Sequence, residues 1–179
     1  MGGAGEIVEV DETFSGRVEG QAVPHRAGGV SSYRNTVLSL VTRGGAVRSF
    51  HVEGIASGEL LPIIRANVSK EAFIISDEWR VYGALGKEYW MHQAVNHSIG
   101  KYVRGIVHTN TVENYYSIFK RGMKGGYQHC KEKHLHRYLA EFDFRYSNRV
   151  ALGISDVARA DRALKGIVGK GLTYQTPRN

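Results

Sequence analysis

The chain has 179 residues, 42% of them hydrophobic and 23% charged. This length is enough for one domain with a hydrophobic core and too short for two domains that each have a large core. It has no apolar run of the roughly 20 residues that cross a bilayer, no signal-peptide pattern at its N-terminus and a single cysteine, so a membrane span, an internal disulfide and a cysteine-based zinc ribbon are not expected. The net charge of +7 is uneven: residues 1–100 hold 9 basic and 11 acidic side chains, whereas residues 101–179 hold 15 and 6, which indicates either an ordinary basic surface or a C-terminal face that binds a polyanion.

Four elements are predicted in the first part of the chain. They are a strand with alternating apolar residues, two strands of a hairpin, and a helix with apolar residues on one side, over residues 6–14, 36–42, 46–52 and 59–68. A loop with several glycines, over residues 15–35, separates the first strand from the hairpin. Pro62 is expected in the first turn of the helix, where proline is tolerated because an amide there would have no helical partner.

The second part begins with a continuous apolar run over residues 72–76, which is typical of a strand buried on both faces. A short helix, a strand and three helices follow, over residues 79–85, 89–95, 111–123, 133–149 and 156–168. This order of elements predicts an α/β protein with a mixed sheet. We expect a core domain over residues 1–150, followed by a C-terminal helix and tail over residues 151–179.

Three acidic residues stand at the ends of predicted elements, and each has a purely structural explanation. Asp11 lies in or just after the first strand, and its neighbour Glu12 is an equal candidate for a functional acid. Asp77 follows the buried strand and can cap the next helix. Glu113 begins a helix three residues after Asn110, a spacing that predicts a capping box with Asn110 as the cap and Glu113 reaching back to it.

Taken together, the three acids predict a metal site. Carboxylates held close together repel one another unless cations neutralise them, and Mg²⁺ and Mn²⁺ prefer oxygen ligands. Two such ions about 3.5–4 Å apart can clamp the attacking and leaving oxygens of a phosphodiester. In this hypothesis Asp11 bridges both metal ions, while Asp77 and Glu113 each hold one of them.

Basic residues follow the last of these acids. Lys120 comes two helical turns after Glu113, about 10 Å along the helix axis, where it can hold a DNA phosphate. With Arg121 and Lys124 it forms a small basic cluster for which DNA contact is expected, although a solvated surface would give the same pattern.

Histidines are numerous, and two of them, His97 and His108, are candidates for lining the same cleft as contacts to DNA or around the metal ions. Asn110 is a further candidate for contacting DNA. A structural zinc site is not expected. His134 and His136 are two residues apart on a helix and face different ways, and Cys130 has no second cysteine to pair with.

Six short blocks occur in a fixed order. They are Val-Asp-Glu-Thr-Phe at 10–14, Ser-Asp-Glu-Trp-Arg-Val-Tyr at 76–82, Val-Asn-His-Ser at 95–98, His-Thr-Asn-Thr-Val-Glu-Asn at 108–114, Phe-Lys-Arg-Gly at 119–122 and His-Leu-His-Arg-Tyr-Leu-Ala-Glu-Phe-Asp-Phe-Arg-Tyr at 134–146. Together they resemble the ISXO-like group of insertion-sequence transposases, over most of the chain. Members of that group usually also carry an N-terminal zinc ribbon and a DNA-binding segment, for which this sequence lacks the cysteines.

The resemblance implies a ribonuclease-H-like fold and a DDE active site formed by Asp11, Asp77 and Glu113, with Lys120 as the accompanying lysine. It implies two Mg²⁺ or Mn²⁺ ions, cleavage at transposon ends and transfer of the 3′-hydroxyl into target DNA. It also implies a homodimer or higher assembly on DNA, in the cytoplasm of a bacterium and associated with the nucleoid. Two alternatives remain open: a metal-dependent nuclease of the same fold, and a DNA-binding remnant of a transposase without catalysis.

Overall fold

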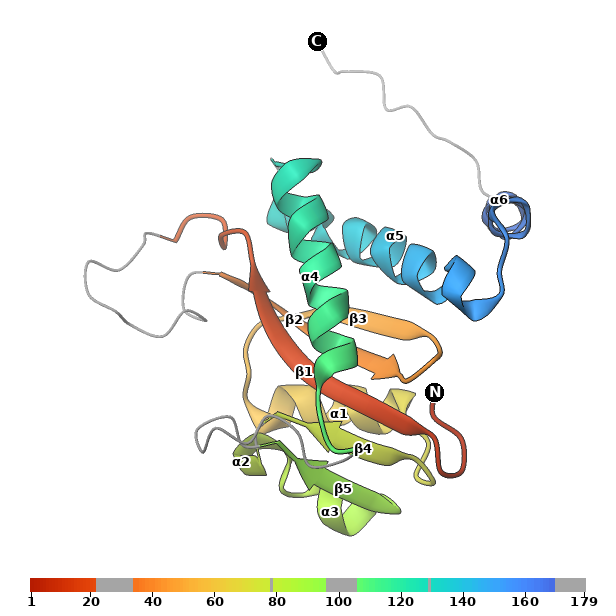
Figure 1. Cartoon of the computed structure of the whole chain (residues 1–179). Coiled ribbons are helices and arrows are strands. Elements are labelled where there is room, and N and C mark those ends of the chain that lie inside the picture. Colours follow the sequence, from red (N-terminus) through yellow and green to blue (C-terminus); the bar gives the residue numbers. More distant parts are fainter. Residues whose placement is uncertain (22–33, 78, 96–105, 129, 170–179) are drawn as a thin grey trace. The chain divides into compact units, whose positions relative to one another are not determined.

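A five-stranded sheet forms the centre of the first of two units in the computed structural model, which describes residues 1–21, 34–77, 79–95, 106–128 and 130–169 (Figure 1). Its strands are β1 (Ile7–Ser15), β2 (Asn35–Thr42), β3 (Val47–Val52), β4 (Phe73–Ser76) and β5 (Met91–Ala94), in the order β3-β2-β1-β4-β5. β1, β2 and β3 pair antiparallel, whereas β4 and β5 run parallel to β1. The predicted α/β class with a mixed sheet flanked by helices is confirmed, and it is consistent with a ribonuclease-H-like fold.

Five helices belong to the same unit, which spans Met1–Ser147. They are α1 (Ser57–Asn67), α2 (Trp79–Tyr82), α3 (Leu85–Glu88), α4 (Asn110–Gly125) and α5 (Leu135–Ser147), with a 3₁₀ turn at Glu132–His134 before α5. The second unit, Asn148–Asn179, contains α6 (Asp156–Lys165), whose first turn is capped by the Ser155 hydroxyl. None of the helices in the described part of the chain is both long and apolar enough to span a bilayer.

The helix α1 differs from its prediction at one end. It begins at Ser57, because the amides of Glu59 and Leu60 both donate to the carbonyl of Ala56. Pro62 therefore lies in the second turn rather than in the first, and that prediction was wrong. The helix still packs its apolar side, Leu60 and Ile64, into the core.

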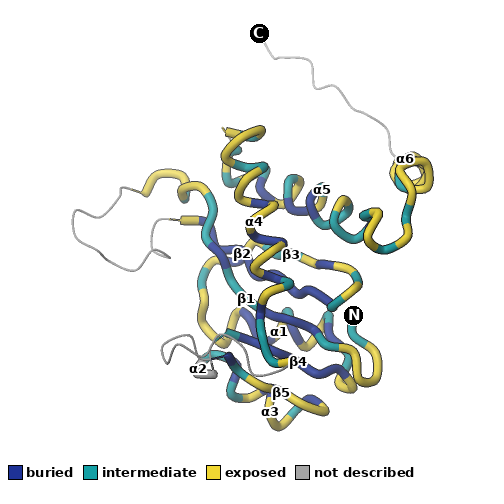
Figure 2. The backbone as a smooth tube through the Cα atoms, viewed as in Figure 1, coloured by how far each residue is buried: buried dark blue, intermediate teal, exposed yellow. Residues whose placement is uncertain are grey.

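The two faces of the sheet differ in character. One face packs against α1, α2 and α3 in a single hydrophobic core, to which β1 contributes Val8 and Val10. The other face, covered by α4 and α5, has two separate apolar clusters: one unites β2 and β3 with these helices, and the other unites β4 with Val95. Because side chains alternate along a strand, β1 presents Glu9, Asp11 and Thr13 to this second face, between the two clusters. The central strand β1 therefore carries a polar strip on this face, although its residues are buried or half-buried (Figure 2).

The helix α5 approaches α4 closely at Gly122. A Cβ atom added there would lie 2.3 Å from Cζ of Phe142. The Phe142 ring also packs edge-to-face against Phe119, with ring centroids 5.3 Å apart, so it cannot easily move away from an added Cβ atom. Glycine is therefore required at this position by packing.

We expect Gly122→Ala to lower the free energy of unfolding by about 1–3 kcal/mol, the usual cost of an overpacked core. Gly125→Ala is the matched control on the same helix, since a Cβ at Gly125 meets no atom within 4 Å. Alanine favours helix over glycine, so the control is expected to be as stable as the parent protein or slightly more so. Urea denaturation measures both, and equal stabilities for the two variants would contradict this packing.

Candidate active site

Asp11 lies on β1, and Asp77 directly follows β4, the parallel strand next to it. The last paired residues of β1 and β4 are Val10 and Ser76, and each acid is the next residue of its chain segment. Residues at equal positions on paired parallel strands point to the same face of the sheet. Val8 and Ile74, a paired couple, both enter the core under α1, so the two acids belong to the opposite face, the one that α4 covers.

The N-terminus of α4 is fixed directly over β1. The carboxylate of Glu9, completely buried, accepts hydrogen bonds from the amides of Thr111 at 2.8 Å and Val112 at 2.9 Å. One turn further along α4, the Tyr116 hydroxyl donates to the main-chain carbonyl of Asp11. These contacts bracket Glu113 and hold the start of the helix next to Asp11.

The predicted capping box is wrong. The cap of α4 is Thr109, whose side chain bonds no helical amide, and Asn110 is the first helical residue. The Thr109 hydroxyl instead donates to Glu113 at 2.8 Å. The physical reason is that Glu9, from another strand, already accepts the bonds of the first amides, so no local side chain is needed for that purpose.

The charges of Asp77, Glu113 and Lys120 all influence the pKa of Asp11. Burial is the main cause that raises the pKa of the Asp11 carboxyl to about 7, and a hydrogen bond from the Glu12 amide opposes this. The negative charges of Asp77 and Glu113 raise this pKa further, and the ammonium group of Lys120 lowers it. The four residues expected from the sequence to be catalytic are therefore electrostatic neighbours.

The three carboxylates suit a hard divalent cation. Asp11 is half-buried, and its negative charge is repelled by those of Asp77 and Glu113. Among the residues that the structure describes, no three His, Cys, Asp or Glu side chains already stand close enough together to hold a metal ion. Binding a cation here therefore requires side-chain rotation. For Glu113, which is exposed, this rotation includes giving up the hydrogen bond from the Thr109 hydroxyl.

Glu12, the alternative functional acid, faces the other way. Its carboxylate accepts a hydrogen bond from the hydroxyl of Tyr82, which belongs to the core under α1. This contact lies on the opposite side of the sheet from α4. The geometry therefore favours Asp11 over Glu12 as the acid that meets Glu113.

An ion network around the buried Glu9 supports the start of α4, and no pattern in the sequence indicated it. Arg43, at the end of β2, contacts Glu9 with its Nε at 2.5 Å and donates to the carbonyls of Ile106 and His108. The His108 ring, a candidate for contacting DNA, joins this network with Nδ1 3.0 Å from Arg43 and 3.5 Å from Glu9. The alternation of β1 places Glu9 on the face of Asp11, but only the fold shows which residues it meets.

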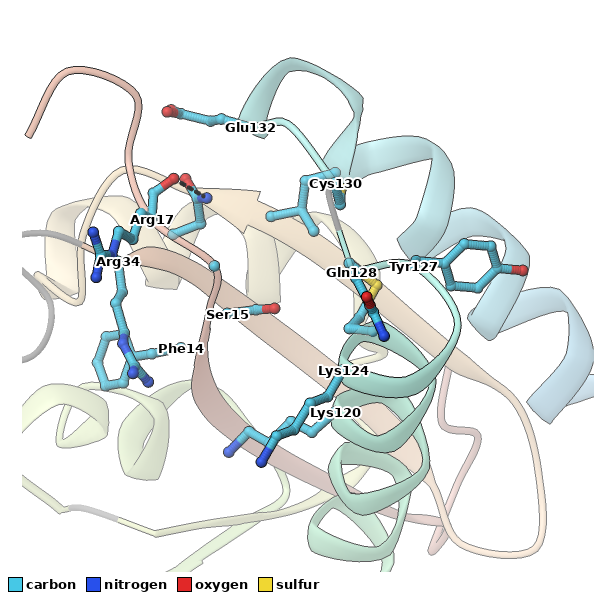
Figure 3. A pocket seen from close by; sticks show the side chains of 14 residues that line it. Phe14, Ser15, Arg17, Arg34, Lys120, Lys124, Tyr127, Gln128, Cys130 and Glu132 are labelled. Carbon is cyan, nitrogen blue, oxygen red and sulfur yellow. Dashed lines mark hydrogen bonds between the residues drawn. The ribbon is translucent and has the colours of Figure 1, made fainter.

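The other candidates for DNA contact occupy different surroundings. Lys120 and Lys124 both line a groove beside α4 (Figure 3), whereas Arg121 is exposed and is not among the residues that line it. The side chain of Asn110 is exposed at the start of the helix. His97 lies outside the described residues.

Comparison with known proteins shows the family of the chain. The family model of the ISXO2-like transposase domain matches residues 3–147. An uncharacterized transposase-like protein of Haemophilus influenzae is 28% identical over 97 residues, which cover 54% of this chain and 77% of that protein. No solved structure matches the chain. Since the family model covers most of the sequence, the chain belongs to the ISXO2-like transposase domain family.

Proposed function

We propose that this chain is the catalytic domain of a DNA transposase whose Asp11, Asp77 and Glu113 hold two Mg²⁺ or Mn²⁺ ions. The observation that carries the proposal is the double attachment of α4 to β1, through Glu9 and through Tyr116, which keeps Glu113 beside the adjacent acids of β1 and β4. The membership of the chain in a transposase family supports DNA as the substrate and a reaction at phosphodiester bonds.

The roles of the residues follow from their positions. Asp11, central in the group, would bridge both cations, and Asp77 and Glu113 would each hold one. Bound in this way, the cations would activate the attacking oxygen and stabilise the leaving one. The Glu12 amide orients the Asp11 carboxylate through a 2.8 Å hydrogen bond, and Lys120 supplies a positive charge near it for a DNA phosphate.

Cleavage hydrolyses one phosphodiester bond, whereas strand transfer exchanges one phosphodiester bond for another. In cleavage, the oxygen of water forms a new bond to phosphorus and the 3′-oxygen of the transposon end leaves with a proton. In strand transfer, that 3′-hydroxyl attacks a target phosphodiester, one P–O bond forms, one breaks, and no oxidant or reductant is consumed. We further infer that the protein acts as a homodimer or higher assembly on paired ends, in a bacterial cytoplasm near the nucleoid.

A cleavage and joining assay separates this function from its alternatives. Two substrates, DNA with uncut transposon ends and DNA with pre-cut ends, are each mixed with a target plasmid and Mg²⁺. A transposase yields joined products, and these are expected. Cleaved DNA without joining would show a nuclease, and DNA binding without either product would show a remnant; both outcomes contradict the proposal.

A further inference from the structure

A groove of about 820 Å³ lies beside α4, next to the C-terminal end of β1. One wall comes from the end of β1 and the start of β2, with Phe14, Arg17 and Arg34. The other comes from the second half of α4 and the segment that follows it, with Lys120 and Lys124. We call it the basic groove, after Arg17, Arg34, Lys120 and Lys124 (Figure 3).

The basic groove has the charge of an anion-binding surface. Four cationic side chains line it against a single carboxylate, Glu132. That carboxylate already accepts a hydrogen bond from the amide of Glu19 at 2.8 Å. Several cations spread along an open groove, rather than gathered at one point, suit a ligand with repeated phosphates.

Local geometry fixes the wall opposite α4. After β1 the chain turns at Gly16, whose φ of +63° is unfavourable for other residues. The side-chain amide of Asn35 then donates to the carbonyl of Arg17 at 3.1 Å, which ties the end of β1 to the start of β2. The backbone that carries Arg17 and Arg34 is therefore held in place at this wall of the groove.

The groove connects with the acids through Lys120. This residue lines the groove, and its charge also acts on Asp11. Lys124 follows it by one helical turn, about 6 Å along the axis, on the same side of α4 (Figure 3). Phe14, on the opposite wall, offers an aromatic face on which an unpaired base can stack.

We propose that the basic groove binds the sugar-phosphate backbone of the DNA strand that is cut, beside the phosphate that reacts at the acids. This inference rests on the proposed function, which it deepens by adding Arg17 and Arg34 as contacts to substrate.

The first test measures binding without catalysis. A fluorescent forked DNA of mixed sequence is titrated by anisotropy in EDTA at several salt concentrations. The double variant Arg17→Ala/Arg34→Ala is expected to bind about 10-fold more weakly, with a salt slope smaller by roughly 1 to 2. The control Arg48→Ala/Lys87→Ala removes the same charge from exposed sites outside the groove. Equal losses in both double variants would overturn the proposal.

The second test uses Cys130, the only cysteine of the chain, which lines the groove. Burial raises the pKa of its thiol, so alkylation by iodoacetamide is followed at alkaline pH. Saturating DNA is expected to slow alkylation several-fold in the parent protein, and less in the double variant at the same DNA concentration. An unchanged rate with DNA demonstrably bound would place the DNA elsewhere.

These tests separate the groove from the catalytic proposal. If the parent protein cuts and joins DNA while both tests fail, only the proposal that the basic groove binds DNA is rejected. Protection of Cys130 in a protein that never cleaves would retain the groove and remove the catalytic function. Equal protection by an RNA hairpin would overturn the assignment of DNA as the ligand.

Discussion

Asp11→Asn is expected to reduce Mg²⁺-dependent cleavage by at least about 10²-fold, the loss typical when a group that organises transition-state charge is removed. Asp11 is at the centre of the proposed site, where the charges of Asp77 and Glu113 both act on it. The amide that replaces the carboxylate keeps the shape but loses the charge needed to bridge cations. Initial rates of cleavage on DNA with uncut transposon ends measure the effect, and Asp77→Asn and Glu113→Gln are expected to behave in the same way.

The loss is not expected to come from unfolding. Burial and neighbouring acids raise the pKa of Asp11 to about 7 in the folded protein, above its ordinary value. At pH 8 the carboxyl is ionised in both the folded and the unfolded chain, and a raised pKa means that ionisation disfavours the folded state. In EDTA at pH 8, Asp11→Asn is therefore expected to be at least as stable as the parent. The control is Glu71→Gln, an exposed acid that is expected to cleave normally. Any acid variant with the parent's rate would remove that residue from the mechanism.

Glu9→Ala is expected to lower the free energy of unfolding by about 3–5 kcal/mol, as when one partner of a buried ion pair is removed. The substitution leaves the guanidinium of Arg43 without its carboxylate and two amides of α4 without their acceptor. Because these contacts also set the start of the helix, cleavage is expected to fall together with stability. Urea denaturation measures the first effect and initial cleavage rates the second.

Two further variants sharpen this result. Glu9→Gln keeps the size and one carbonyl acceptor, so its stability is expected to lie between those of the parent and Glu9→Ala. Asp161→Ala breaks an exposed pair with Lys165 and is expected to change stability little. A Glu9→Ala variant as stable as Asp161→Ala would mean that α4 is held in place by other contacts.

Local patterns were sufficient to predict most elements of the fold, although the one helix expected over residues 79–85 is two short helices, α2 and α3. The uninterrupted apolar run at residues 72–76 marked β4 as buried on both faces, and the alternation in β1 separated Val8 and Val10 from Glu9 and Asp11. The order of elements then led to a mixed sheet. All of these signals operate within a few residues, where backbone geometry and burial determine the pattern.

Long-range partners could not be predicted in the same way. Glu9 meets Arg43 from 34 residues away and Thr111 from 102 residues away, and no local pattern encodes either meeting. For the same reason Asn110 was taken for a helix cap when the acceptor comes from β1. Arg17 and Arg34 are far apart in the sequence, so their joint presence in one groove depends on the pairing of β1 with β2.

The claim that three carboxylates share divalent cations is tested most directly by diffraction from crystals soaked in Mn²⁺ at pH 8, recorded for anomalous scattering. We predict two anomalous peaks at the N-terminal end of α4, both within ligand distance of Asp11, with Asp77 and Glu113 each turned toward one of them. Peaks confined to other parts of the surface, with Asp11 and its acidic neighbours unmoved, would contradict the account.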